Sequence, residues 1–195
     1  MRKVSAYLLM SLDGVVEAPD TFVRDGLYDD MIDVLRETID EQDAILLGRK
    51  MFEEWSEFWP TADHEPFASF INEHPKYVVS STLRSVDAWP NSTLIEDDVA
   101  DHLAALKHQD GKTIGVHGTI TLVNSLLAAG LLDELRLTVL PAVAGRGRRL
   151  FDDGETVQQL TARSSRTTAN GLHISSTNAR ADQRSVIAGP TRATR

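Results

Sequence analysis

Residues 114–151 read IGVHGTITLVNSLLAAGLLDELRLTVLPAVAGRGRRLF, and this stretch decides the fold. It opens with a short β-prone segment, turns at Gly118, and continues with apolar residues at helical spacing. Gly130 is placed to end that helix, and a second apolar strand follows and runs to Pro141. A strand, a helix and another strand with so few residues between them predict a crossover unit of a parallel sheet.

The same stretch predicts a binding site. Gly115 and Gly118 let the backbone come close to another group. The predicted helix starts directly after the turn, so its free N–H groups and its positive dipole end face outward. An anion such as a pyrophosphate is therefore expected at this turn.

Strands and helices alternate along the rest of the chain. Two β-rich stretches after Phe151 flank Asn170-Gly171, a dipeptide typical of a hairpin. The pattern predicts an α/β fold, a three-layer αβα sandwich around a mixed, mainly parallel sheet with a C-terminal antiparallel hairpin. The strands are expected at 3–11, 44–47, 76–79, 92–96, 112–116, 135–140, 157–168 and 172–177, and the helices at 28–41, from 48 onward, 63–73, 98–109 and about 120–129.

Length and composition indicate one soluble domain. The 195 residues are 42% hydrophobic and 25% charged, as in ordinary globular proteins. We expect a single domain over residues 1–178 and a flexible, polar, Arg-rich tail over 179–195. The net charge of −9 argues against a nucleic-acid partner. The absence of cysteine excludes disulfides and thiolate zinc sites, and the scattered histidines predict no metal site.

The N-terminus does not predict export. The first fourteen residues, MRKVSAYLLMSLDG, alternate as a strand does, and no cleavage pattern follows before Glu17. No apolar segment reaches the ~18 residues that a membrane span needs. We therefore expect a cytoplasmic protein with no membrane partner.

Three strand ends carry the residues of interest. They are Gly48-Arg49-Lys50, Ser80-Ser81-Thr82 and the turn at 115–119. Ligands gather beyond the carboxyl ends of strands in an open α/β sheet. A guanidinium and serine hydroxyls beside a helix start suit the 2′-phosphate and pyrophosphate of NADPH. Each segment alone also fits a plainer interpretation, a solvated cation at a helix start or a hydroxyl-rich turn.

Together these motifs resemble a known family. The order SLDG (11–14), ILLGRKMFEEW (45–55), VVSST (78–82), GVHGTITLVNSLL (115–127), GLLDELRLTVLP (130–141) and GRGRRLF (145–151) is similar to the dihydrofolate reductase-like superfamily. The similarity is closest to the reductase domain of the bifunctional riboflavin-biosynthesis deaminase/reductase, and it covers about residues 1–178. It implies an αβα sandwich that binds NADPH and transfers a hydride to a heterocycle or a ribosylamino-pyrimidine.

The resemblance also implies the cofactor-binding residues. Gly118 stands where the family often has the second of two adjacent glycines, and His117 replaces the first, which leaves the geometry of this turn open. The expected residues are Gly48, Arg49, Lys50 and Met51 for the cofactor phosphates, Ser80, Ser81 and Thr82 for the 2′-phosphate, and Gly115, His117, Gly118, Thr119 and Ile120 for the pyrophosphate turn.

For substrate and catalysis the resemblance points to Asp13, which matches an acidic residue at the mouth of the substrate pocket. The alternative is a loop carboxylate that bonds its own backbone. Phe52 and Trp55 either line the pocket or belong to the core. A basic cluster, Arg146 with Arg148 and Arg149, either meets a substrate phosphate or is solvated.

The sequence thus predicts an NADPH-dependent oxidoreductase similar to 5-amino-6-(5-phosphoribosylamino)uracil reductase. Asp13, or a water that it orders, would supply the proton. Two alternatives stay open: a non-catalytic NADPH-binding or regulatory protein of this fold, and an α/β protein that binds a nucleotide sugar or a flavin without hydride chemistry. The resemblance implies a homodimer through the terminal β region.

Overall fold

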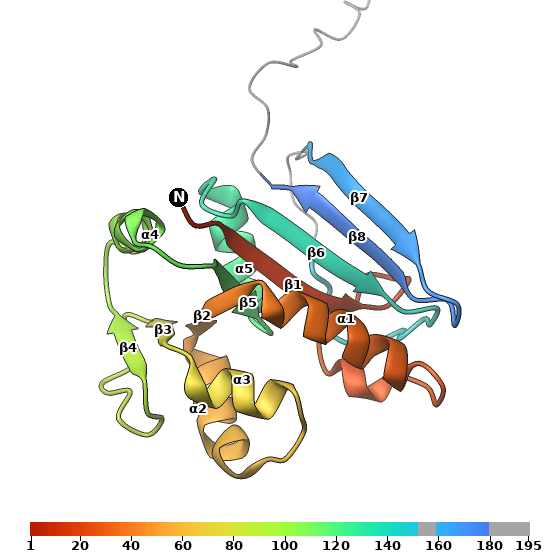
Figure 1. Ribbon diagram of the computed structural model, residues 1–195, viewed down its shortest axis with the longest axis horizontal. Helices are drawn as coiled ribbons and strands as arrows, with labels where there is room; N and C mark the ends of the chain where they lie inside the picture. Colours follow the sequence, from red (N-terminus) through yellow and green to blue (C-terminus); the bar gives the residue numbers. More distant parts are fainter. Residues whose placement is uncertain (152–158, 180–195) are drawn as a thin grey trace, which may run out of the picture.

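The computed structural model describes residues 1–151 and 159–179 (Figure 1). Helices connect consecutive strands up to β6 except between β3 and β4, and two further strands follow. The strands are β1 (Val4–Met10), β2 (Gln42–Gly48), β3 (Lys76–Val79), β4 (Ser92–Ile95), β5 (Thr113–His117), β6 (Glu134–Val139), β7 (Thr161–Thr167) and β8 (His173–Asn178). The helices are α1 (Tyr28–Asp40), α2 (Arg49–Phe58), α3 (Phe67–Glu73), α4 (Val99–His108) and α5 (Ile120–Ala128), with short 3-10 turns η1 (Pro19–Thr21) and η2 (Trp59–Thr61).

One eight-stranded sheet has the order β4-β3-β2-β5-β1-β6-β8-β7. The six strands from β4 to β6 are parallel, because helices return the chain between most of them. β8 pairs antiparallel with β6, and β7 closes the sheet as its outer strand. The predicted mixed, mainly parallel sheet with a C-terminal hairpin is confirmed.

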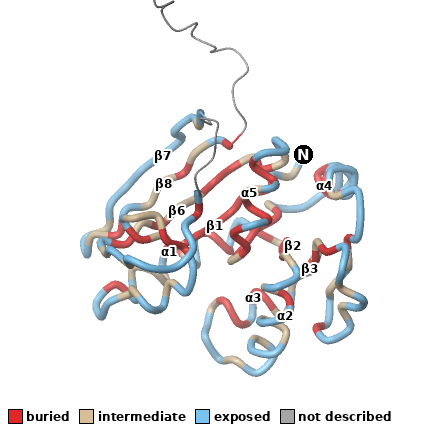
Figure 2. The backbone as a smooth tube through the Cα atoms, turned by 180° about the vertical axis from the view of Figure 1, so that it is seen from behind, coloured by how far each residue is buried: buried red, intermediate tan, exposed pale blue. Residues whose placement is uncertain are grey.

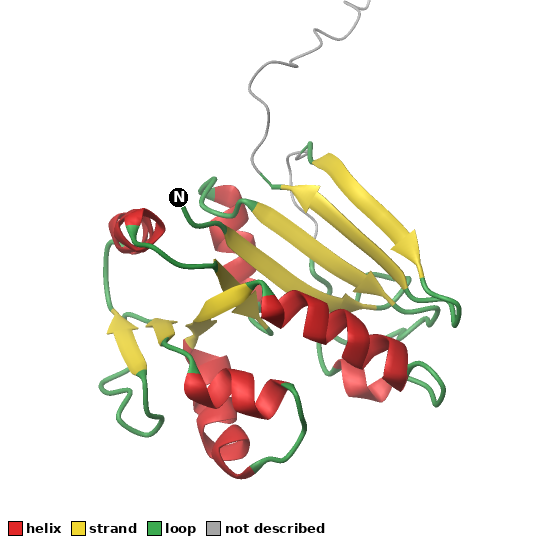
Figure 3. Cartoon of the chain, in the orientation of Figure 1, coloured by secondary structure: helices red, strands yellow, loops and turns green. Residues whose placement is uncertain are grey.

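Helices cover both faces of the parallel part of the sheet (Figure 3). On one face, buried side chains of α1, α2 and α3 pack on Ile45, Leu47 and Val78. On the other face, α4 and α5 pack on Val4 and Ala6. Neighbouring residues of one strand point to opposite faces, so β2 contributes Ile45 and Leu47 to the first of these cores and Ala44 and Leu46 to the second. Buried residues accordingly concentrate on β1, β2, β5 and α5, whereas β7 is exposed along its length (Figure 2).

The structure corrects two boundaries. The third helix starts at Phe67 and not at residue 63, because Pro66 occupies its N-cap and fixes the preceding backbone outside the helix. Ala179 is buried and its N–H donates to the Asp133 carbonyl at 3.0 Å, so this residue belongs to the domain. The rest of the predicted tail, residues 180–195, and the first two residues of the predicted strand 157–168 lie outside the described residues.

Within residues 1–151 and 159–179, none of the helices has both the length and the apolar character needed to cross a bilayer.

Candidate functional site

The parallel register brings three of the predicted segments to one edge of the sheet. Gly48 pairs with Val79, so Ser80 lies one residue beyond Gly48 on the neighbouring strand. Leu46 pairs with Val116, and continuing that register by two residues sets Gly48 beside Gly118. The carboxyl ends of β3, β2 and β5 therefore meet, as the sequence predicted.

Two glycines let the turns at this edge pack against each other. A Cβ on Gly48 would lie 2.8 Å from Cγ2 of Thr119. Gly118 has a φ of +65°, and a Cβ there would lie 2.8 Å from Cε of Met51 and 3.0 Å from Cζ2 of Trp55. Only glycine fits both positions without displacing a neighbour. The start of α2 and the start of α5 are thus held side by side.

Neither helix start is capped by a side chain. Gly48 is the N-cap residue of α2 and has no side chain, and the N-cap residue of α5 is Thr119, whose hydroxyl donates to the His117 carbonyl at 2.9 Å instead. The N–H groups of the first turns are therefore left for a ligand. Two positive helix ends next to each other favour an anion.

Exposed cations stand at the same place. Arg49 and Lys50 form the first turn of α2, and both are exposed. The Arg49 guanidinium is paired with Glu53 one turn further on, at 2.9 Å, and both side chains are close to half exposed. Such a surface pair is weak and can open to release Arg49 for a phosphate.

The three hydroxyl-bearing residues after β3, Ser80, Ser81 and Thr82, have different roles. The Ser80 hydroxyl accepts hydrogen bonds from the N–H groups of Thr82 at 3.1 Å and Leu83 at 2.9 Å, so Ser80 shapes the turn. Ser81 and Thr82 are exposed beside it. These two side chains are the ones that this turn presents to a ligand.

Gly115 and His117 belong to the packing beneath the turn. A Cβ on Gly115 would collide with the Gln42 amide, whose Oε1 lies 2.7 Å from Nε2 of His117. The His117 ring is buried against Tyr7, Phe67 and Phe70. Burial lowers the pKa of His117 to about 4, so the ring is neutral at physiological pH. Sequence reasoning missed Gln42; a polar residue opening an apolar strand was the available signal.

The aromatic and apolar residues predicted for the site separate into two groups. Met51 and Trp55 are half-buried against Gly118, at the junction of α2 and α5. Phe52 is 2% exposed and lies in the core next to Trp89. Ile120 is also buried, although its N–H opens α5. Trp55 is thus the predicted aromatic residue that reaches the turn.

Asp13 lies further along the same edge, beyond the end of β1. Its carboxylate accepts hydrogen bonds from the N–H groups of Ala144 and Gly145, both at 2.9 Å, and from the Ser11 hydroxyl at 2.7 Å. These bonds, that of Ser11 first, lower the pKa of Asp13 to about 2. The carboxylate ties the turn after β1 to the loop after β6. Its role in catalysis stays a prediction.

The comparisons with known proteins agree with this architecture. A family model for the RibD C-terminal domain matches residues 2–174. The chain belongs to the RibD C-terminal domain family. The uncharacterized protein YyaP of Bacillus subtilis (strain 168) is 28% identical over 175 residues, which cover 88% of this chain and 92% of YyaP.

Solved structures show the same fold at low sequence identity. A protein from Shewanella sp. PV-4, assigned to riboflavin biosynthesis, superposes with a TM-score of 0.69 at 18% identity, over 90% of this chain and 98% of the other. The Thermotoga maritima diaminohydroxyphosphoribosylaminopyrimidine deaminase/5-amino-6-(5-phosphoribosylamino)uracil reductase gives a TM-score of 0.64 at 14% identity, over 91% of this chain and 56% of that one. The reductase-like fold predicted from the motifs is confirmed.

Proposed function

We propose that this protein is an NADPH-dependent reductase that transfers a hydride to a small heterocycle of the ribosylamino-pyrimidine type. The observation that carries the proposal is the pair of uncapped helix starts at Gly48 and Thr119, held in contact by glycine turns, with Arg49 exposed beside them. N–H groups and positive helix ends fit a pyrophosphate, and a guanidinium fits a 2′-phosphate. Membership of a reductase-domain family supports the same assignment.

Each part of the edge has its own task in this proposal. The first turns of α2 and α5 bind the pyrophosphate, while Arg49 opens from Glu53 and, with Ser81 and Thr82, binds the 2′-phosphate. Bound NADPH supplies the hydride from its nicotinamide. With a pKa of about 2, Asp13 stays ionised near neutrality, so it orders a water that carries the proton and does not donate one itself.

The test is cofactor binding by the wild type and by Arg49→Ala, measured with NADPH and NADH. A charge-assisted contact is worth about 1.5–3 kcal/mol, so Arg49→Ala should weaken NADPH about tenfold to a hundredfold and leave NADH nearly unchanged. Equal losses of affinity for NADPH and NADH would contradict the assignment of Arg49 to the 2′-phosphate. A thermal-shift screen that adds FMN and folate tests the flavin-binding alternative. NADPH binding without turnover of any pyrimidine or flavin precursor would favour a regulatory protein.

We also propose a homodimer that pairs through the terminal β region. β7 is the outer strand of the sheet and all seven of its residues are exposed, which leaves a long edge that proteins commonly cover. Light scattering should then give twice the 21.5 kDa of one chain. A monomeric mass at micromolar concentration would remove this part of the proposal.

A further inference from the structure

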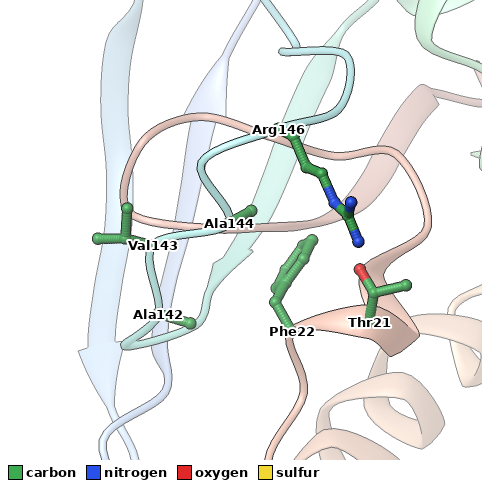
Figure 4. A pocket seen from close by; sticks show the side chains of 6 residues that line it. All are labelled: Thr21, Phe22, Ala142, Val143, Ala144 and Arg146. Atoms are coloured by element: carbon green, nitrogen blue, oxygen red, sulfur yellow. The ribbon is translucent and has the colours of Figure 1, made fainter.

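A cavity of about 310 Å³ lies between the end of η1 and the loop that follows β6 (Figure 4). Its volume is at the lower end of the range for small-molecule sites, enough for one part of a ligand. It is separate from the paired glycine turns, and its lining residues are Thr21, Phe22, Ala142, Val143, Ala144 and Arg146.

Both walls of this cavity are fixed by hydrogen bonds. Asp13 holds the N–H groups of Ala144 and Gly145, and Glu17 accepts from the N–H of Arg148 at 3.0 Å, so the loop is tied down on both sides of Arg146. On the opposite wall, the N–H and hydroxyl of Thr21 both donate to the Ala18 carbonyl. Because both walls are already fixed, binding a ligand here would cost little additional conformational entropy.

Arg146 is the charged group of the cavity, and its guanidinium extends toward Thr21 and the Phe22 ring (Figure 4). The nearby Arg148 donates to the Thr121 hydroxyl, and Arg149 donates to the Asp13 carbonyl. The Arg146 guanidinium, by contrast, has no hydrogen bond or ion pair with residues 1–151 or 159–179. Because the chain carries a net charge of −9, an anion would be attracted here by this local cation and not by the whole protein.

The remaining lining restricts the occupant. Phe22 and the methyl groups of Ala142 and Ala144 offer apolar contacts. The Thr21 hydroxyl has already given its proton to Ala18, so its oxygen only accepts. The occupant should therefore carry one oxyanion for Arg146 and a body that packs on Phe22.

We propose that this cavity binds the phosphate monoester of the reductase substrate, with Arg146 as the phosphate ligand. This rests on the proposed function for the nature of the substrate. Neighbouring strands lie about 4.8 Å apart and β1 separates β5 from β6, so these two strands are about 10 Å apart. The register through β1 sets Val139 three residues beyond His117, so the end of β6 lies roughly 14 Å from the cofactor turn at the end of β5. One substrate can then place its phosphate at Arg146 and its ring near the cofactor.

The test is calorimetric titration of the full-length protein with ribose 5-phosphate, ribose, inorganic phosphate and gluconate, at pH 7.5. Arg146→Gln should weaken ribose 5-phosphate about tenfold to a hundredfold. The matched control is Arg36→Gln, which removes the same charge from the exposed face of α1 and should change nothing. Arg49→Ala is the second comparison, because the cofactor turn could also take a phosphate. NADPH is titrated separately against every variant.

The outcomes separate the two proposals. NADPH binding by the wild type with ribose 5-phosphate affinity unchanged in Arg146→Gln overturns the phosphate site and leaves the cofactor assignment standing. Loss of ribose 5-phosphate binding in Arg49→Ala alone moves the phosphate to the cofactor turn and also overturns it. Gluconate binding as tightly as ribose 5-phosphate through Arg146 would mean a carboxylate site. An Arg146-dependent ribose 5-phosphate site in a protein that does not bind NADPH would instead refute the proposed function.

Discussion

The two ends of the sheet's carboxyl edge are built in different ways. At the β2–β5 end, glycines and helix starts that follow directly in sequence form a cradle of backbone N–H groups. At the β1–β6 end, the Asp13 carboxylate accepts hydrogen bonds from two backbone N–H groups, 131 and 132 residues further along the chain. These bonds fix the loop that carries Arg146. The first end uses backbone dipoles and the second uses side-chain charge. The variants below break one end and spare the other.

The largest effect is expected from Gly118→Ala. Both Gly118 and Gly130 have a left-handed backbone, with φ of +65° and +66°. A side chain costs roughly 1–2 kcal/mol in that conformation at either position. Only at Gly118 would it also push on the Met51 methyl group and the Trp55 ring at the junction of α2 and α5. Gly118→Ala should therefore weaken NADPH about a hundredfold or more, since several charge-assisted contacts lose their geometry together.

Gly130→Ala is the control for that variant. It should cost the same backbone strain, with no atom within 4 Å of the new Cβ, and leave NADPH binding as in the wild type. Unfolding by urea and calorimetric titration measure the two quantities. Similar NADPH affinities for the two variants would show that contact between the helix starts does not build the cofactor site.

The second effect concerns pH and the residue beneath the cradle. His117 has a pKa of about 4 in the folded protein, below its ordinary value of 6.5. Between these values the unfolded chain binds the proton and the folded one does not, so stability falls as pH falls. From pH 7 to pH 5 the free energy of unfolding should drop by about 2 kcal/mol. His117→Gln, which still bonds to Gln42, should lose most of this slope; an unchanged slope would assign it to other groups.

The sequence predicts the local turns of the candidate site better than the contacts between segments that are far apart in the chain. Gly48-Arg49, Ser80 and Gly118-Thr119 were predictable because each is a local strand-to-helix turn, and parallel strand ends meet at one edge. The roles of Gly115 and His117 were not, because both depend on Gln42, more than seventy positions earlier. The Asp13 contacts with Ala144 and Gly145 and the cavity beside Phe22 likewise join segments about 120 to 130 residues apart. Spacing along one chain does not reveal such contacts.

The third prediction tests Asp13. Asp13→Asn keeps the size, but each carboxylate oxygen now accepts from a different N–H group, and the NH2 that replaces one of these oxygens cannot accept. If the carboxylate orders the proton-carrying water, hydride transfer should fall at least roughly tenfold while the NADPH dissociation constant is unchanged. Stopped-flow oxidation of NADPH measures the first and calorimetry the second.

A pH series separates the structural part of this effect. The pKa of Asp13, about 2, is below its ordinary value of 3.8, so its contribution to stability is present above that value and is lost as pH falls toward 2. The difference in melting temperature between wild type and Asp13→Asn should therefore shrink from pH 4 to pH 2. A variant that turns over substrate at the wild-type rate but melts earlier would make Asp13 purely structural.

The smallest effect is expected from Glu53→Gln. Glu53 holds the Arg49 guanidinium at 2.9 Å in the free protein, and NADPH must compete with that pair. An exposed pair one helical turn apart is worth about 0.3–0.5 kcal/mol, so its removal should tighten NADPH about twofold. Glu57→Gln is the matched control, because Glu57 is exposed on the same helix and has no ion pair within the described residues. Both variants remove one negative charge, so any gain from long-range electrostatics is shared and disappears at high salt. A gain in affinity that is specific to Glu53→Gln and larger for NADPH than for NADH would indicate that Arg49 binds the 2′-phosphate. An equal gain in Glu57→Gln would show that the effect comes from the net charge of α2 and not from the Arg49–Glu53 pair.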